Sequence, residues 1–262
     1  MISHSQVTGI KQTKLTVQDL SKSYGKARVI ERIDLEVSGG EIVGLIGPNG
    51  AGKTTLLNAI CGITPIDTGS VSFNGLSLIG LSPHAIAQLG IGRLFQDVRL
   101  FPRATVLDNV LVGFGAQAGE RLWNVLFSHS RTASDEERNT QSAINILKTL
   151  GIKVPMEVAA ETLSYGEQKI LSLARLLALD ANLLLVDEIA AGLSISMRHK
   201  VAGLIRQLCK EHRGILLSEH DLTLVSEICT RVCVLSERRL LIADSPKEIL
   251  RSGVIRRLLY GV

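Results

Sequence analysis

Residues 47–55 read G-P-N-G-A-G-K-T-T, and this glycine-rich run is flanked by two segments of different character. Before it, Ile42–Ile46 is an apolar run typical of a buried parallel strand, and after it Lys53–Cys61 has the pattern of a helix. A glycine-rich turn in this setting points successive backbone N–H groups inward, and the helix adds the positive end of its dipole. The order of strand, glycine loop and helix therefore predicts a site for the phosphates of a nucleotide.

The side chains of this loop have separate predicted roles. Lys53 can reach the terminal phosphates as a mobile charge, and the hydroxyl of Thr54 is placed to ligate a magnesium ion that bridges them. Thr55 is expected to hydrogen-bond a phosphate further back. The remaining loop residues are expected to line the phosphates with their backbone: Gly47, Pro48, Asn49, Gly50, Ala51 and Gly52. The loop alone does not choose among ATPases, GTPases and kinases.

Length and composition are those of a globular protein: 262 residues, 45% of them hydrophobic, enough to bury the core of one large domain. No apolar run reaches the roughly 18 residues that are needed to cross a bilayer. The N-terminus is polar and lacks the apolar core of a signal peptide. We therefore expect a cytoplasmic chain whose role in any transport depends on a separate membrane partner.

Charge and cysteine content argue against two other classes of site. The net charge of +4 is small and the basic residues are scattered, so we expect no nucleic-acid partner. Cys229 and Cys233 have a spacing that could suggest a metal site, but the chain has no matching second pair. We expect these two, with Cys61 and Cys209, to be reduced and buried.

Two alternating stretches, Leu15–Val17 and Ile33–Val37, predict an antiparallel lead-in ahead of the glycine loop, with Tyr24 in the turn between them. An exposed aromatic ring at this place could stack on a purine base, with Val29 packed beside the base. Plain packing of Tyr24 is the alternative. If the ring stacks on a base, these two residues complete the nucleotide site.

A change of pattern follows Ile91–Phe95, another apolar run. It ends at Gln96, whose side-chain carbonyl can ligate magnesium or orient water. From Asp97 to about Leu163 the strand signals stop, and three stretches are predicted to be helical: Thr105–Val112, the surroundings of Trp123, and Glu136–Leu150. We interpret this segment as an inserted helical lobe.

Ser164 and Glu167 form the capping-box pattern at the start of a predicted helix that ends at Leu179. That is the structural interpretation. The functional interpretation is a second anion site, because a serine hydroxyl, the backbone of Gly166 and the helix dipole converge at the same point. The two interpretations are compatible.

Two carboxylates follow the buried apolar strand Leu183–Val186, at the end where ligands of open α/β sheets bind. Asp187 suits a magnesium ligand and Glu188 a general base for an attacking water. A further strand, Ile215–Leu217, leads to His220, which can face the same site. A purely structural histidine is the alternative.

With these motifs in this order, the sequence resembles the ATP-binding subunits of ABC transporters over nearly its whole length. The resemblance implies ATP and Mg²⁺ as cofactors and a P-loop NTPase (RecA-like) α/β fold. The implied fold consists of a parallel-sheet core (about 13–96 and 172–262), an antiparallel β lead-in, a helical lobe (about 97–171) and a tail (1–12). It also implies these motifs: Tyr24 (A-loop), Gly47–Thr54 (Walker A), Gln96 (Q-loop), Leu163–Gln168 (signature), Leu183–Asp187 (Walker B), Glu188 (catalytic carboxylate), Ala191–Ser194 (D-loop) and His220 (switch histidine).

Partners follow from the same resemblance. Two copies pair head to tail in this family, so Ser164, Gly166 and Gln168 of one copy would contact the nucleotide on the Walker A loop of the other. Permease subunits would contact residues 97–102, and a separate solute-binding protein would complete the system. The chain would then lie on the inner face of the cell membrane through its permease partners.

The apolar residues of segment 97–102 have two interpretations. The resemblance implies a groove that receives a permease helix, with Leu100 or Phe101 as apolar anchor and Arg99 at the rim. In an isolated domain, Val98, Leu100 and Phe101 would instead fill the core of the lobe.

Within the family, the chain is most similar to ATPases of branched-chain and other hydrophobic amino-acid importers, and next to those of urea importers. The similarity lies in residues 90–101 and in the short sequences L-S-Y-G-E-Q and A-A-G-L. Ile189 replaces the usual proline, and Ser194 stands where the D-loop usually ends in Asp or Asn. These departures leave open a binding module that barely hydrolyses ATP. A DNA- or ribosome-directed ABC ATPase is disfavoured, because there is no long coiled-coil insertion and no second nucleotide domain.

Overall fold

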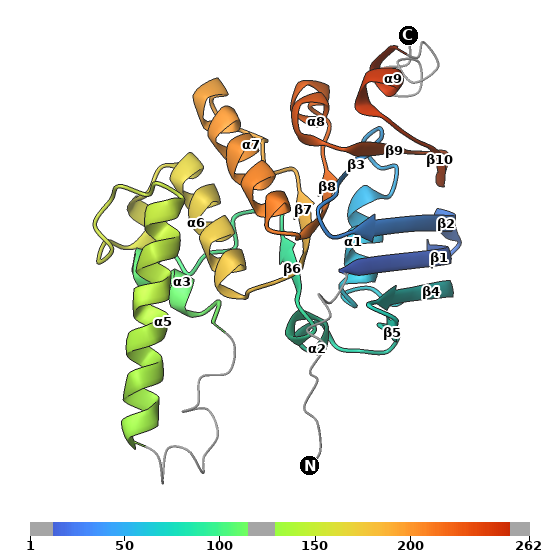
Figure 1. Ribbon diagram of the computed structural model, residues 1–262. Coiled ribbons are helices and arrows are strands. Elements are labelled where there is room, and N and C mark those ends of the chain that lie inside the picture. Colours follow the sequence, from blue (N-terminus) through green and yellow to red (C-terminus); the bar gives the residue numbers. More distant parts are fainter. Residues whose placement is uncertain (1–12, 115–128, 252–262) are drawn as a thin grey trace, which may run out of the picture.

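Two β-sheets and a layer of helices make up the computed structural model, which describes residues 13–114 and 129–251 (Figure 1). The predicted helix around Trp123, the tail 1–12 and the last residues of the chain lie outside the described residues. The sheets form one half of the molecule, and helices α3, α5 and α6 form a lobe beside it. This arrangement confirms the predicted fold class.

The antiparallel sheet has the strand order β2-β1-β4-β5. Its strands are β1 (Lys14–Tyr24), β2 (Ala27–Ser38), β4 (Thr68–Phe73) and β5 (Leu76–Ser77). Strands β1 and β2 are longer than predicted, because pairing continues past the alternating stretches down to Tyr24 opposite Ala27. The inward residues of β1 and β2, among them Leu15 and Ile33, are fully buried.

The second sheet has the order β10-β9-β3-β8-β7-β6, with all neighbours parallel except β10. Its strands are β3 (Ile42–Ile46), β6 (Ile91–Leu94), β7 (Leu183–Asp187), β8 (Gly214–Ser218), β9 (Arg231–Ser236) and β10 (Arg239–Asp244). Every residue of β3, β7 and β8 is buried, which explains their continuous apolar runs. The glycine loop therefore begins beside the ends of β7 and β8, at the edge where such sheets bind ligands.

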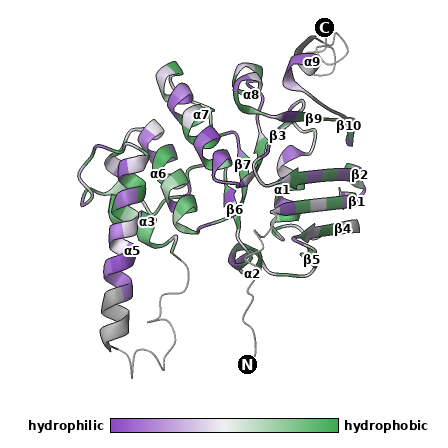
Figure 2. Ribbon diagram, in the orientation of Figure 1, coloured by the Kyte–Doolittle hydropathy of each residue, from purple (hydrophilic) through white to green (hydrophobic). Residues whose placement is uncertain are grey.

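Helices α1 (Lys53–Ile60), α2 (Pro83–Gln88), α7 (Ile195–Lys210), α8 (Leu222–Ile228) and α9 (Pro246–Arg251) belong to the sheet half. The lobe contains α3 (Val106–Leu111), α5 (His129–Thr149) and α6 (Tyr165–Ala178). Helix α5 is hydrophilic over much of its length in Figure 2, and it buries Ala143 and Leu147. None of the helices described has the length and apolarity to cross a membrane.

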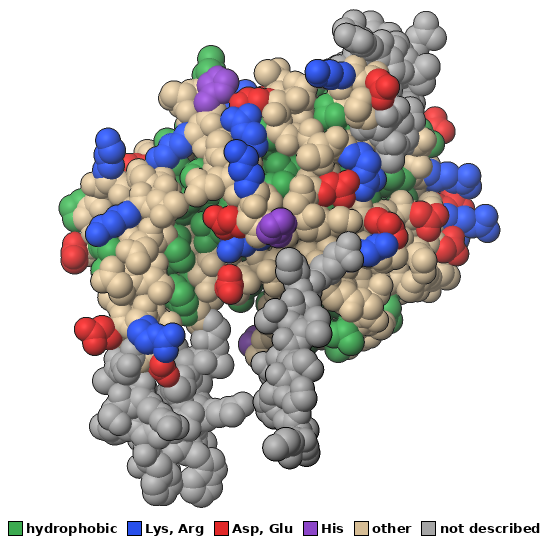
Figure 3. All heavy atoms as spheres, viewed as in Figure 1, with side chains coloured by type: hydrophobic (Ala, Val, Ile, Leu, Met, Phe, Trp, Pro, Cys, Tyr) green, Lys and Arg blue, Asp and Glu red, His purple; other side chains and the backbone are tan. Residues whose placement is uncertain are grey.

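Burial of the cysteines was expected for all four and holds for three. The four cysteines are free thiols; three are buried and Cys229 is partly buried. Burial raises the pKa of Cys61 and Cys233 to about 11 and that of Cys229 to about 12, so these thiols stay protonated at neutral pH. Figure 3 shows basic and acidic side chains interspersed on the face viewed.

Candidate functional site

The glycine loop between β3 and α1 has a backbone that only glycine allows at several positions. Gly50 and Gly52 have φ angles of 80° and 106°, in the left-handed region. A Cβ at Gly47 would collide with the carbonyl oxygen of Leu235, and one at Gly52 would lie 2.6 Å from a methyl group of Ile30. The loop is therefore pressed against β9 and β2 with its curvature set by glycine.

Lys53 begins α1 and is buried. Its Nζ donates hydrogen bonds to the carbonyl oxygens of Gly47 at 2.8 Å and Pro48 at 3.1 Å, so the ammonium group lies against the glycine loop. Burial lowers the pKa of Lys53, while the carboxylates of Glu188 and Asp187 act in the opposite direction. The structure thus brings this cation close to both carboxylates of the β7 end.

Asp187, the last residue of β7, is buried to 3% exposure of its side chain. Its Oδ2 accepts hydrogen bonds from Thr54 Oγ1 at 3.2 Å and Arg93 Nη2 at 2.8 Å. Its Oδ1 is buried without a hydrogen-bond partner among the described residues. A free carboxylate oxygen beside a threonine hydroxyl is a fitting donor set for magnesium, which prefers oxygen ligands.

A cavity of about 290 Å³ brings two of the predicted catalytic residues, Glu188 and His220, together with the glycine loop. It is lined by Gly47, Pro48 and Asn49 of the glycine loop, by Glu188 after β7, by His220 after β8, and by Ile46 and Leu222. His220 Nδ1 lies 3.9 Å from Glu188 Oε1, within range of an ion pair when the histidine is protonated. His220 is half-exposed and lines this cavity; its role in hydrolysis stays a prediction.

The signature residues do not line this cavity. Ser164 is the N-cap of α6, where its hydroxyl and backbone N–H both bond the Glu167 carboxylate, at 2.7 Å and 3.0 Å. These hydrogen bonds, the side-chain one first, lower the pKa of Glu167. Gln168 donates to the carbonyl oxygens of Leu163 and Ala160 of its own chain. The capping box is confirmed; nucleotide contacts of Ser164, Gly166 and Gln168 stay predictions.

Three further predicted nucleotide residues lie on other segments, at the end of β1, on β2 and just beyond β6. Tyr24 is 50% exposed at the end of β1, so it is not a core residue. Val29 lies close to Gly52, where an added Cβ would be 3.1 Å from the Val29 carbonyl oxygen. Gln96 is exposed just beyond β6, and the pairing of Leu94 with Val186 sets it beside the carboxyl end of β7.

Three buried charged residues of the site were missed in the sequence: Arg93 on β6, Lys169 on α6 and Glu219 after β8. Arg93 and Asp187 form a salt bridge with side chains only 6% and 3% exposed. Glu219 Oε1 accepts a hydrogen bond from Ala190 N at 2.9 Å, and burial raises the pKa of Glu219. A signal was available for Arg93 and Lys169, because each is a charge on a largely apolar element and needs a partner. Glu219 follows its strand in the polar run 219–221 and gave no such signal.

The comparisons with known proteins agree with this geometry. A protein-family model described as "ABC transporter" matches residues 30–191. The chain is 33% identical over 253 residues to the high-affinity branched-chain amino acid transport ATP-binding protein LivG of Salmonella typhimurium, covering 96% of this chain and 99% of that protein. It is 32% identical over 247 residues to the lipopolysaccharide export system ATP-binding protein LptB of Escherichia coli, covering 94% and 97%.

Solved structures show the same similarity. A nucleotide-free ATP-binding cassette from an ABC transporter is 26% identical with a TM-score of 0.81, covering 94% of this chain and 98% of that one. The family match spans more than half of the chain and contains the glycine loop and the β7 carboxylates. The chain therefore belongs to the ABC transporter family and is an ATPase of that family.

Proposed function

We propose that this chain is the ATP-binding and ATP-hydrolysing subunit of an importer for branched-chain or other hydrophobic amino acids. The observation that carries its ATPase role is the cavity of about 290 Å³, which joins the phosphate loop with Glu188 and His220. The assignment of the cargo is based on the similarity to LivG and on the sequence of Gly90–Phe101. In this proposal the chain is cytoplasmic and reaches the inner face of the membrane through its partners.

The chain's own residues divide the work of hydrolysis. Lys53 moves from the loop carbonyls to the terminal phosphates, whose charge it offsets. Glu188, with a side chain 17% exposed at the cavity wall, takes the proton of the attacking water. His220 acts from 3.9 Å away, on the water or on the γ-phosphate. A magnesium ion, when bound, would neutralise phosphate charge, held by Thr54, Asp187 and Gln96.

A head-to-tail dimer accounts for the second anion site. The N-terminus of α6 lies in the lobe and outside the lining of the nucleotide cavity, although it carries a serine and the positive end of a helix dipole. In the proposed dimer, Ser164, Gly166 and Gln168 of one copy contact the nucleotide on the partner copy's glycine loop. Hydrolysis then requires closure of two chains.

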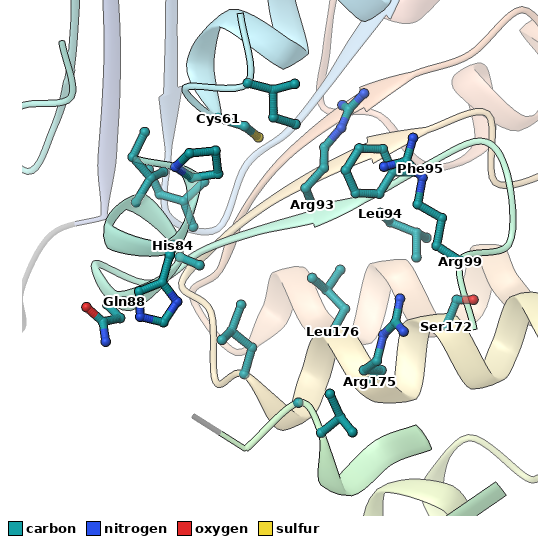
Figure 4. A pocket seen from close by; sticks show the side chains of 18 of the residues that line it. Cys61, His84, Gln88, Arg93, Leu94, Phe95, Arg99, Ser172, Arg175 and Leu176 are labelled. Carbon is teal, nitrogen blue, oxygen red and sulfur yellow. The ribbon is translucent and has the colours of Figure 1, made fainter. Parts of the chain in front are cut away.

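A second cavity, of about 520 Å³, is the proposed docking groove for a permease. Figure 4 shows Arg93, Phe95 and Arg99 along one wall, with Arg175 and Leu176 on α6 opposite. Phe101 is 51% exposed and lines the groove, whereas the half-buried Leu100 packs against the lobe core. The core-filling interpretation therefore holds for Leu100 and is wrong for Phe101, which is left as the apolar anchor.

The docking groove is tested with Phe101→Ala and Arg99→Glu. Arg99 stacks its guanidinium 3.7 Å from the centre of the Phe95 ring, so charge reversal changes the groove rim without touching the nucleotide cavity. Both variants should bind ATP as tightly as the wild type while capturing less permease and losing most transport. Leu76→Ala and Arg32→Glu, at exposed sites on the antiparallel sheet, are the matched controls. Unchanged assembly and transport in both groove variants would remove this surface from the proposal.

The cargo is tested by reconstitution in vesicles with the permease and solute-binding proteins that copurify with the chain. We expect ATP-dependent accumulation of labelled leucine, and none with the Lys53→Ala chain. Accumulation of urea without leucine, or ATP-driven release of lipopolysaccharide, would contradict amino-acid import. Either result would leave the ATPase assignment intact.

A further inference from the structure

A buried lysine on α6 is hydrogen-bonded to the segment that carries Glu188. Lys169 is 4% exposed, and its Nζ donates three hydrogen bonds to backbone carbonyl oxygens: Glu188 at 2.9 Å, Ile189 at 3.1 Å and Ala191 at 2.9 Å. An ammonium group has three N–H donors, so all of them are used on one loop. We call residues 188–192 the 188–192 loop.

Burying the charged ammonium group of Lys169 costs free energy. We infer from this cost that the contact does more than fill space. Burial lowers the pKa of Lys169, and the carboxylates of Glu219 and Glu188 oppose this effect. The neighbouring residues of the same helix, Ile170 and Leu171, are apolar and buried in the lobe core. An unpaired ammonium would not be stable here, and the three carbonyl groups are its hydrogen-bond partners.

The 188–192 loop needs such a restraint. Glu188 has a φ of 46°, a left-handed conformation that is unfavourable for a residue with a side chain. The next residue is Ile189, so no proline ring restricts the backbone there. Glu188 N donates to the carbonyl oxygen of Ser218 at 2.9 Å, and Ala190 N donates to Glu219. These bonds hold the loop to β8 from one side, and Lys169 holds it from the lobe.

Tyr165 strengthens the link between α6 and the loop. It lies four residues before Lys169, on the same face of the helix, and the lysine Nζ is 5.3 Å from the centre of its ring. A Cβ at Gly192 would lie 3.0 Å from Tyr165 Cε1, so the ring is packed on the end of the loop. One face of α6 therefore holds both ends of the 188–192 loop, and Ser164 caps the same helix.

We propose that Lys169 is a positioning residue that fixes the Glu188 carboxylate and makes its position depend on that of α6. Any displacement of α6 moves three carbonyl groups next to the general base. The proposal rests on the proposed function, which makes Glu188 the general base and places α6 in a dimer. There, the N-terminus of α6 contacts the partner's nucleotide, so nucleotide at one site aligns the Glu188 that serves the other site.

The experiment compares Lys169→Met, whose unbranched side chain is one atom shorter and has no donors, with Leu15→Ala as control. Leu15 is fully buried in β1 of the antiparallel sheet, in a core cluster that contains neither α6 nor the 188–192 loop, so its truncation lowers stability without displacing α6. In Lys169→Met we expect kcat to fall by about 30-fold or more while KM for ATP changes less than about threefold. In Leu15→Ala, kcat per folded molecule should stay at the wild-type value.

A second readout needs no catalysis. Hydrogen exchange of the Ala190 and Ala191 amides should become at least about tenfold faster in Lys169→Met, while the Leu56 amide of α1 exchanges as in the wild type. Lys169→Gln keeps two donors and should show smaller effects in both readouts; it replaces Lys169→Met if that variant does not fold. A folded Lys169 variant with wild-type kcat and wild-type loop exchange would overturn the proposal. Loop exchange still tests it if the wild type releases no phosphate, a result that would instead refute the proposed function.

Discussion

Glu188→Gln should reduce steady-state phosphate release by about 10²- to 10⁴-fold while leaving ATP binding intact. The amide has the shape of the carboxylate and cannot take a proton from water. The backbone contacts of residue 188, with Lys169 and with Ser218, do not involve the side chain and are retained. Phosphate release, nucleotide binding and size-exclusion chromatography in ATP measure the three expected effects: lost turnover, unchanged affinity and accumulated dimers.

Glu211→Gln is the control for this variant, since Glu211 is an exposed carboxylate paired with Arg213 beyond α7. It should hydrolyse ATP at the wild-type rate. If Glu188→Gln also does so, Glu188 is not the general base. A Glu188→Gln chain that no longer binds ATP would show that the side chain shapes the glycine loop rather than the chemistry.

Mixing two inactive chains should restore ATPase activity. Lys53→Ala removes the cation on the glycine loop and should weaken ATP binding by about 10- to 100-fold. Ser164→Arg places bulk and a charge at the N-cap of α6, which is outside the nucleotide cavity of its own chain. A mixed dimer keeps one intact composite site, so an equal mixture of chains that pair at random should show at most about a quarter of wild-type activity. The activity falls below a quarter if alignment of Glu188 depends on nucleotide at the other site.

The control for mixing is Lys53→Ala with the Lys53→Ala/Ser164→Arg double variant, a pair that leaves no intact site in any dimer. It should stay inactive at every ratio. Failure of the first mixture to recover, with mixed dimers demonstrated by differently tagged chains, would contradict the site shared between two copies.

Local chemistry made much of this fold predictable from the sequence. The apolar run Leu183–Val186 predicted a strand buried on both faces, and all residues of β7 are buried. The capping box of Ser164 and Glu167 forms as predicted, because all its partners lie within three residues. The glycine loop likewise needs only its own backbone angles and the flanking strand and helix.

Contacts between distant segments decided the rest. Arg93 meets Asp187 across 94 positions, and Lys169 reaches the 188–192 loop from another helix. Neither contact could be read from a local sequence pattern. The order of β6, β7 and β8 in the sheet and the position of α6 bring these groups together. The same packing determines that Phe101 is exposed and that Leu100 packs against the lobe core.

The sequence by itself thus determined the phosphate loop, the strands and helices around it and the two carboxylates at the end of β7, since each depends on neighbours along the chain. Only the tertiary structure decided which buried charges pair, and that Glu188 and His220 share one cavity. The physical reason is that a buried charge must find a partner, and the fold, not the spacing, determines which one lies within reach.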